Sequence, residues 1–145
     1  MKKIGVLVSI MLLVAIFLAG CTNTTVSDVV EEIEEDNGVK EVVIYEFYGA
    51  TCPHCKSMNA WFEKIKLNYP DLRVEQYEVY KNASNRAFFE EVAQAYGKKS
   101  GGVPTIFIGE KRMVGFSKSL GDKIELEIKA CLNSGCISPK DKLAQ

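Results

Sequence analysis

The sequence predicts an α/β domain in which a mixed four-stranded sheet carries helices on both faces. Between residues 41 and 133, strand-like and helix-like patterns follow one another in the order strand, helix, strand, helix, strand, strand, helix. The last two strand patterns are separated only by a short turn at residues 109–111, which predicts an antiparallel hairpin. Helical crossovers between the earlier strands predict parallel pairing, so the sheet is expected to be mixed.

The first predicted strand covers residues 41–48, whose apolar and β-branched composition is typical of a buried strand, with Glu46 as the exception. A helix is predicted over residues 53–68, and Tyr69-Pro70 ends it. Its inward face carries the regularly spaced side chains Met58, Phe62, Ile65 and Tyr69. A second strand with imperfect alternation is predicted over residues 72–80.

The second half begins with Asn82, which is predicted to cap a helix that runs through Tyr96 and ends at Gly97. We expect its inward face to consist of Phe88, Phe89, Val92 and Ala95. A loop at 98–102 precedes the hairpin strands, predicted over 105–109 and 110–116, and a last amphipathic helix is predicted over 117–133. Residues 138–145 are expected to be a frayed tail.

Residues 1–20 have the pattern of an export signal, because a short basic region precedes an almost unbroken apolar run. The sequence Leu18-Ala19-Gly20-Cys21 resembles the lipobox of bacterial-type lipoproteins, which implies that Cys21 is lipidated and becomes the mature N-terminus. An uncleaved transmembrane anchor and simple secretion are the alternatives. All three place the domain outside the cytoplasm. The remainder of 21–37 is interpreted as a tether followed by a short acidic helix.

Composition excludes one class of partner and agrees with the compartment. The net charge of −1 gives no electrostatic basis for binding nucleic acid. The chain has five cysteines, and a lipidated Cys21 leaves four, an even number that suits an oxidising compartment. The basic loop residues Lys98, Lys99, Lys111 and Arg112 are interpreted as solvated.

Cys52 and Cys55 are separated by two residues and stand where the first strand pattern gives way to a helical pattern. This placement is typical of redox chemistry. If a helix begins at Pro53, unpaired N–H groups and the helix dipole favour the Cys52 thiolate. The neighbouring His54 stabilises the anion further, so we expect the Cys52 pKa to lie below its ordinary value of about 8.5. A dithiol stabilised in this way makes its disulfide a stronger oxidant.

Two other interpretations of the cysteine pair stay open. A zinc site would need more ligands, but His54 is the only histidine, and the spacing of Cys131 and Cys136 is wider than usual for zinc. A purely structural disulfide is the second alternative. Redox catalysis is favoured over both.

The run Tyr45-Glu46-Phe47-Tyr48, the C-P-H-C motif at 52–55 and Val103-Pro104-Thr105 together resemble the thioredoxin superfamily, and its DsbA side most closely. The resemblance covers roughly residues 42–132 and implies a thioredoxin fold. Only one helix and a loop separate Tyr80 from Pro104, so the helical domain inserted in DsbA is absent. We therefore expect a minimal thioredoxin-like domain over residues 38–136, followed by a tail at 137–145.

The resemblance implies roles for individual residues. Cys52 would be the exposed nucleophile and Cys55 the resolving thiol. Pro104 would be the cis-proline beside the dithiol, and Val103 and Thr105 would help to hold an extended substrate, Val103 through its backbone groups. An ordinary turn at 103–104 is the alternative.

Glu46 lies six residues before Cys52, where the family often keeps a buried carboxylate. Burial in an apolar strand would raise its pKa and let it exchange protons with Cys55. The alternative is a glutamate that reaches solvent at the end of the sheet. Cys131 and Cys136 are interpreted as a structural disulfide, with a second redox pair and free thiols as alternatives.

The sequence therefore predicts a membrane-tethered, extracytoplasmic thiol–disulfide oxidoreductase that needs no cofactor or metal. It would act as a monomer on the thiols and disulfides of exported proteins, and a membrane-bound redox partner would recycle it. Oxidation or isomerisation is favoured because of His54. A cell-envelope disulfide reductase and a carrier that holds zinc or copper through Cys52 and Cys55 are the alternatives.

Overall fold

The computed structural model describes residues 40–145 of the chain. The export signal, the lipidated Cys21, the tether and the short acidic helix expected from the sequence therefore lie outside the described residues. None of the helices in the described part is both long and apolar enough to cross a membrane.

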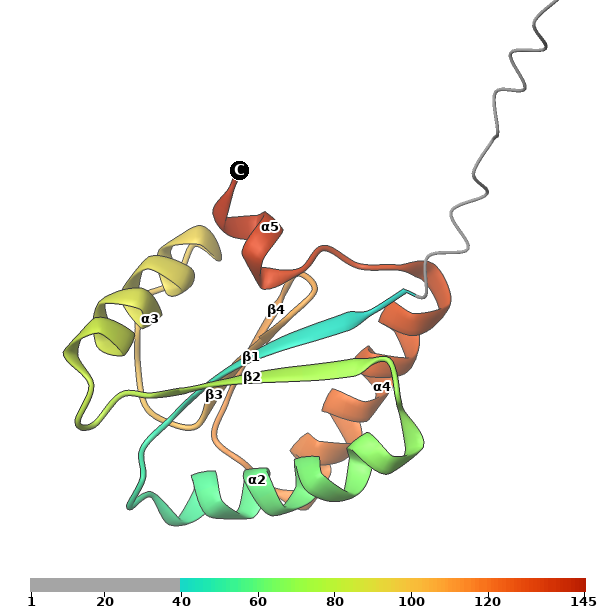
Figure 1. Cartoon of the computed structure of the whole chain (residues 1–145), viewed down its shortest axis with the longest axis horizontal. Helices are drawn as coiled ribbons and strands as arrows, with labels where there is room; N and C mark the ends of the chain where they lie inside the picture. The colour runs from blue at the N-terminus through green and yellow to red at the C-terminus, as the bar shows by residue number, and fades with distance from the viewer. Residues whose placement is uncertain (1–39) are drawn as a thin grey trace, which may run out of the picture. The chain divides into compact units, whose positions relative to one another are not determined.

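The described residues form one mixed sheet with the strand order β2-β1-β3-β4 and helices on both faces (Figure 1). β1 pairs in parallel with β2 and antiparallel with β3, and β3 forms an antiparallel hairpin with β4. The predicted fold class is confirmed. In chain order the elements are β1 (Val42–Tyr48), α2 (Pro53–Ile65), the 3-10 helix η1 (Lys66–Asn68), β2 (Leu72–Glu78), α3 (Ala83–Ala95), β3 (Thr105–Ile108), β4 (Lys111–Val114), α4 (Lys118–Ser134) and α5 (Pro139–Leu143).

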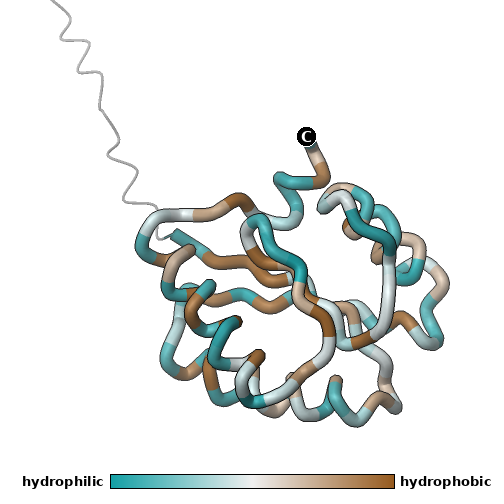
Figure 2. Tube along the Cα trace, turned by 180° about the vertical axis from the view of Figure 1, so that it is seen from behind, coloured by the Kyte–Doolittle hydropathy of each residue, from teal (hydrophilic) through white to brown (hydrophobic). Residues whose placement is uncertain are grey.

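Two apolar layers cover the two faces of the sheet, and they follow from the alternation of side chains along β1. Val42 and Ile44 point into a cluster with residues of α2 and α4, whereas Val43, Tyr45 and Phe47 point into a cluster with residues of α3. Figure 2 shows the result, with the hydrophobic colour concentrated on the central strands and mixed colour on the helices. β1 is therefore buried on both faces, as its composition predicted.

Two predicted details of the helices differ from the structure. The helix predicted over 53–68 changes at residue 66 from α2 into η1, a tightening that is common at the end of a helix. In α3 the buried side chains are Phe89, Val92 and Ala93 rather than Ala95. The inward stripe is thus displaced around the helix, because spacings of three and four from Phe89 lead to Val92 and Ala93.

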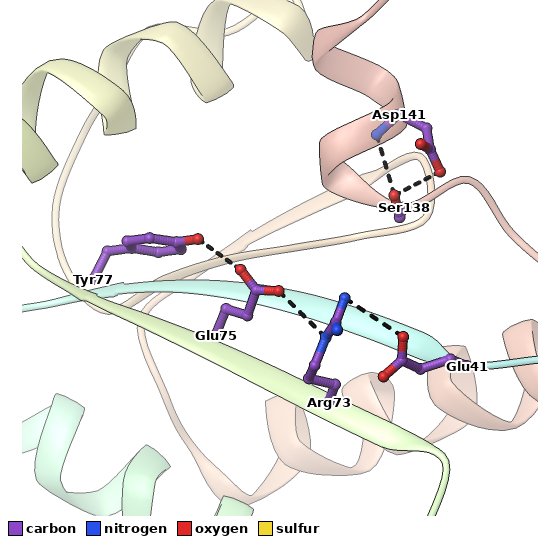
Figure 3. A network of polar contacts seen from close by, with 6 residues as sticks. All are labelled: Glu41, Arg73, Glu75, Tyr77, Ser138 and Asp141. Atoms are coloured by element: carbon purple, nitrogen blue, oxygen red, sulfur yellow. Dashed lines mark hydrogen bonds and ion pairs between the residues drawn. The ribbon is translucent and has the colours of Figure 1, made fainter.

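The prediction of a frayed tail at residues 138–145 is wrong, because this segment contains helix α5. Ser138 caps the helix by accepting a hydrogen bond from the Asp141 N–H, and its hydroxyl also contacts the Asp141 carboxylate (Figure 3). Pro139 is buried at the first helical position, and Leu143 packs against the cluster under α3. Tertiary contacts therefore hold a helix too short to be stable alone.

A chain of polar contacts runs along β2 on the face that carries α3 and α5 (Figure 3). Arg73 lies 3.4 Å from a Glu41 oxygen and 3.3 Å from a Glu75 oxygen, and the Tyr77 hydroxyl donates to Glu75 at 2.7 Å. Burial and the Glu75 carboxylate raise the pKa of Tyr77. The exposed ion pairs contribute little to stability, so this network mainly orients the side chains along β2.

Candidate active site

The loop after β1 delivers Cys52 to the start of α2. The Cys52 N–H donates to the Gly49 carbonyl at 3.0 Å, which closes a tight turn. Cys52 then occupies the cap position of α2, where its sulfur accepts a hydrogen bond from the Cys55 N–H at 3.2 Å, and Pro53 is the first helical residue. The sulfur therefore lies at the positive end of the helix dipole, an environment that favours a thiolate in the reduced protein.

Cys52 and Cys55 form a disulfide, with Cα atoms 5.2 Å apart. Cys52 is 7% exposed and Cys55 is 1% exposed, and the Gly49 N–H contacts the Cys55 sulfur at 3.5 Å. Both cysteines are thus buried, so the exposed side chain expected for Cys52 is not found, although Cys52 is the less buried of the two. The His54 side chain between them is exposed to solvent.

The loop before β3 lies against this disulfide. The Val103–Pro104 peptide bond is cis, and the Val103 carbonyl oxygen is 3.6 Å from the Cys52 sulfur. Thr105 is fully buried, and its hydroxyl donates to the Gly102 carbonyl at 2.6 Å, which fixes the turn before Pro104. The loop beside the redox pair thus contains the residues singled out from the sequence, Val103 and Pro104. The third such residue, Thr105, supports this loop from the start of β3.

Glu46 is fully buried on the face of β1 that α2 covers. Gln76 on β2 donates to its carboxylate at 2.7 Å. Burial raises the pKa of Glu46 to about 7, although the Gln76 hydrogen bond and the charge of Lys66 act in the opposite direction. A carboxyl with this pKa can hold or release a proton near neutral pH.

Asn59 connects Glu46 to the helical turn that carries Cys55, and sequence reasoning missed it. With its amide nitrogen turned toward Glu46, Asn59 donates to the two carboxylate oxygens at 2.7 and 3.0 Å and to the Cys55 carbonyl at 3.2 Å. The signal in the sequence is a polar side chain one turn after Cys55, beside the buried Met58. Asn59 and Gln76 together supply the donors that an ionised Glu46 needs inside the apolar layer.

Glu78 joins the active-site loop to the loop that precedes α3. Its carboxylate accepts hydrogen bonds from the N–H groups of Ala50 at 3.3 Å, Tyr80 at 2.9 Å and Lys81 at 2.8 Å. The backbone donors, with that of Lys81 first, lower the pKa of Glu78. The Tyr80 ring covers Gly49, where any side chain would overlap the ring atoms. Contacts from Glu78 and Tyr80 therefore hold the Gly49–Ala50 backbone that leads to Cys52.

A family model described as Glutaredoxin matches residues 42–113, a span that includes both active-site cysteines and the cis-proline. The matched span is just under half of the chain, and its similarity supports thiol–disulfide oxidoreductase activity. No curated protein is similar enough in sequence to match it.

Solved structures share the thioredoxin-like fold at low sequence identity. A candidate thiol:disulfide interchange protein DsbE from Chlorobium tepidum is 19% identical with a TM-score of 0.51, and the match covers 65% of this chain and 82% of that one. A periplasmic thioredoxin-like protein from Salmonella enterica serovar Typhimurium is 17% identical with a TM-score of 0.48, covering 67% and 87%. The Chlorobium tepidum structure supports the fold of this chain, and neither structure identifies a substrate for it.

The second cysteine pair of this thioredoxin-like domain lies away from the redox pair. Cys131 and Cys136 form a disulfide, in which Cys131 is buried and Cys136 is exposed. Both lie next to Gly109, which follows β3, whereas Val103 beside Cys52 precedes β3. The two disulfides therefore stand at opposite ends of that strand. Within residues 40–145, no group of three or more histidine, cysteine or acidic side chains is placed to hold a metal ion.

Proposed function

We propose that this oxidoreductase works outside the cytoplasm, tethered to the membrane, and that it transfers its Cys52–Cys55 disulfide to exported proteins or isomerises their disulfides. The export-signal pattern and the lipobox at Cys21 support the location. The observation that carries the chemistry is the cap position of Cys52, because the helix N-terminus stabilises the thiolate that is released when a substrate becomes oxidised.

The reaction proceeds through a mixed disulfide. A substrate thiolate attacks the Cys52 sulfur, a substrate–Cys52 bond forms, and the Cys52–Cys55 bond breaks with Cys55 leaving as a thiolate. A second substrate thiolate then attacks the substrate sulfur of the mixed disulfide, and Cys52 leaves as a thiolate. Two electrons have passed from the substrate dithiol to the protein, and a partner disulfide must accept them before the next cycle.

Glu46 serves as the proton store for Cys55. When Cys55 leaves as a buried thiolate, the raised pKa of Glu46 lets its carboxyl supply a proton near neutral pH. Asn59 contacts both the Glu46 carboxylate and the Cys55 carbonyl, so it holds the Glu46 carboxyl beside the helical turn that carries the Cys55 sulfur. In the reductive direction the same steps run backward.

Redox titration of the Cys52–Cys55 pair against glutathione tests the direction of transfer. The exposed His54 and the helix N-terminus should place the potential above about −200 mV, on the oxidising side of the superfamily range. A potential near −270 mV would contradict the oxidase assignment and favour a reductase.

Trapping identifies the substrates and separates catalysis from metal transport. The Cys55→Ala variant should accumulate mixed disulfides at Cys52 with envelope proteins, because the resolving thiol is missing, whereas Cys52→Ala should accumulate none. Stoichiometric zinc or copper on freshly purified reduced protein, together with no turnover of reduced peptides after chelation, would favour the carrier instead.

A further inference from the structure

A hollow opens directly beside the loop that contacts Cys52. It has a volume of about 300 Å³ and lies between α3 and the loop that returns from it to β3. Its apolar part is formed by Val79, Phe89 and Val103, and the Val103 carbonyl oxygen lies 3.6 Å from the Cys52 sulfur. The remaining lining residues are Tyr80, Arg86, Glu90, Ser100, Gly101 and Gly102.

A second hollow, of about 380 Å³, continues the first along α3. The two share Glu90 and Ser100, and the second adds Gln94, Lys98 and Lys99. Along α3 the lining residues 86, 90 and 94 are four apart and so share one face of the helix, while residues 98–103 form the opposite wall. We call the combined feature the α3 groove.

The lining of the α3 groove differs along its length. The apolar side chains line only the hollow near Cys52, where the Arg86 guanidinium donates to the Val79 and Tyr80 carbonyls, whereas Lys98 and Lys99 line only the far hollow. Among the ion pairs of the described residues, none involves Lys98 or Lys99, so their charges are free to meet a ligand. Glu90 is the one carboxylate that lines either hollow, against Arg86 and the two lysines. This gradient is complementary to a segment that is apolar near the reacting sulfur and acidic farther away.

The wall of the α3 groove is built for a polypeptide backbone. Gly101 and Gly102 present bare backbone to the groove, and a Cβ at either position would meet nothing within 4 Å. Within the described residues, their N–H groups make no backbone hydrogen bond of the kind that closes the neighbouring turns. Such exposed backbone is available for the main-chain pairing that an extended segment offers.

We propose that the α3 groove selects exported substrates in which an apolar residue flanks the exchanging cysteine and an acidic residue lies about four positions away on one side of it. The apolar side chain sits against Val79 and Phe89, and the acidic one lies between Lys98 and Lys99. This inference rests on the proposed function and names the substrate class that the site prefers.

A charge-reversal experiment on the full-length protein tests the cationic end. Reduced two-cysteine peptides carry a leucine next to the first cysteine and either Glu or Lys four positions away on each side, and their oxidation is followed by mass spectrometry. For one of the two placements, the wild type should oxidise the Glu peptide about five- to tenfold faster than the matching Lys peptide. This is the size of effect expected from two exposed ion pairs. The Lys98→Glu/Lys99→Glu variant should reverse this preference, and 0.5 M salt should remove it.

A matched control has the same change of net charge on the other face of the sheet. Lys64→Glu/Lys123→Glu alters exposed lysines of α2 and α4 that form no ion pair among the described residues. This variant should keep the wild-type preference. If both double variants change the preference equally, general electrostatics explain the result and the groove proposal is wrong.

A steric variant tests the apolar end without disturbing the fold. Gly101→Leu places a side chain in open space at a position whose backbone does not require glycine, so it should fill the groove. Peptide oxidation should slow about tenfold relative to oxidation of the small neutral dithiol dithiothreitol. Unchanged peptide rates would overturn the groove proposal alone, whereas a protein that oxidises neither dithiothreitol nor any peptide would overturn the proposed function itself.

Discussion

Glu46 shows how the surroundings of one buried side chain set its pKa. Its carboxyl sits among apolar side chains, where the ionised form is costly, yet two amides are placed to donate to it. Neither amide carries a charge, so they reduce the cost of ionisation without removing it. Burial raises the pKa of Glu46 to about 7, and the Gln76 hydrogen bond and the charge of Lys66 act in the opposite direction.

Replacing Glu46 by Gln should stabilise the oxidised protein increasingly as the pH rises. The folded pKa of about 7 lies above the ordinary value of 4.5, so the stability that Glu46 supplies below pH 4.5 is lost as the pH rises through 7. The shift corresponds to a gain for Glu46→Gln of about 3 kcal/mol at pH 8 relative to pH 4. Urea denaturation over this range measures it, and a gain that does not change with pH would contradict the buried ionisation.

Asn59→Ala should raise the pKa of Glu46 above its wild-type value, because the ionised carboxylate loses donors to both of its oxygens. The carboxyl carbon shift of Glu46, followed by NMR as a function of pH, measures this directly. Ser57→Ala, on the exposed side of the same helix, is the matched control and should leave the titration in place. A Glu46 titration that is identical in Asn59→Ala and wild type would show that the amide does not act on the carboxyl.

At the scale of elements, α5 adds to the helical layer that α3 forms on one face of the sheet. Lys142 makes an ion pair with Glu110 in the β3–β4 turn and lies 5.9 Å from the centre of the Tyr96 ring. The Tyr96 hydroxyl in turn donates to the Gly109 carbonyl at 2.8 Å. The short C-terminal helix thus ties the end of α3 to the hairpin.

Leu143→Ala should lower the free energy of unfolding by about 1–2 kcal/mol. This is less than a fully buried leucine contributes, because the Leu143 side chain is only half-buried. Chemical denaturation measures the loss, and Ala144→Gly beyond the last helical turn is the comparison for a change at the terminus. If Leu143→Ala is neutral, α5 is not held by its packing.

The elements that sequence reasoning predicted well are those with a long internal pattern. The continuous apolar run of β1, the capping residue Asn82 and the paired spacing of Cys52 and Cys55 each carry their own signal. Helix α5 does not, because five residues are too few for a periodicity and its stability comes from distant side chains. Asn59 was missed for the same reason, since its partner Glu46 lies on another element.

At the scale of the whole molecule, the two disulfides are separated by the length of β3. A direct exchange between them inside one domain would have to cross the core. The Cys131–Cys136 bond instead lies where α4 ends and the chain turns toward α5. The geometry therefore favours a structural role for this bond over a relay of electrons to Cys52.

The double variant Cys131→Ser/Cys136→Ser should lose stability but keep its redox chemistry. Closure of so short a loop is worth about 2 kcal/mol in the unfolded-chain entropy account. The Cys52–Cys55 potential and the rate of peptide oxidation should equal those of the wild type. A changed potential or a stalled catalytic cycle would instead assign the second pair to electron transfer.

The start of β1 gives the domain a natural place for attachment. Lys40 contacts the Asn133 carbonyl beside the Cys131–Cys136 bond, whereas the opposite end of β1 leads into the Cys52 loop. A seven-residue strand spans about 23 Å. An attachment before Lys40 is therefore separated from the Cys52 loop by the length of β1. Immobilising the protein on a bead or an electrode through its N-terminus should therefore leave the sulfur chemistry unhindered.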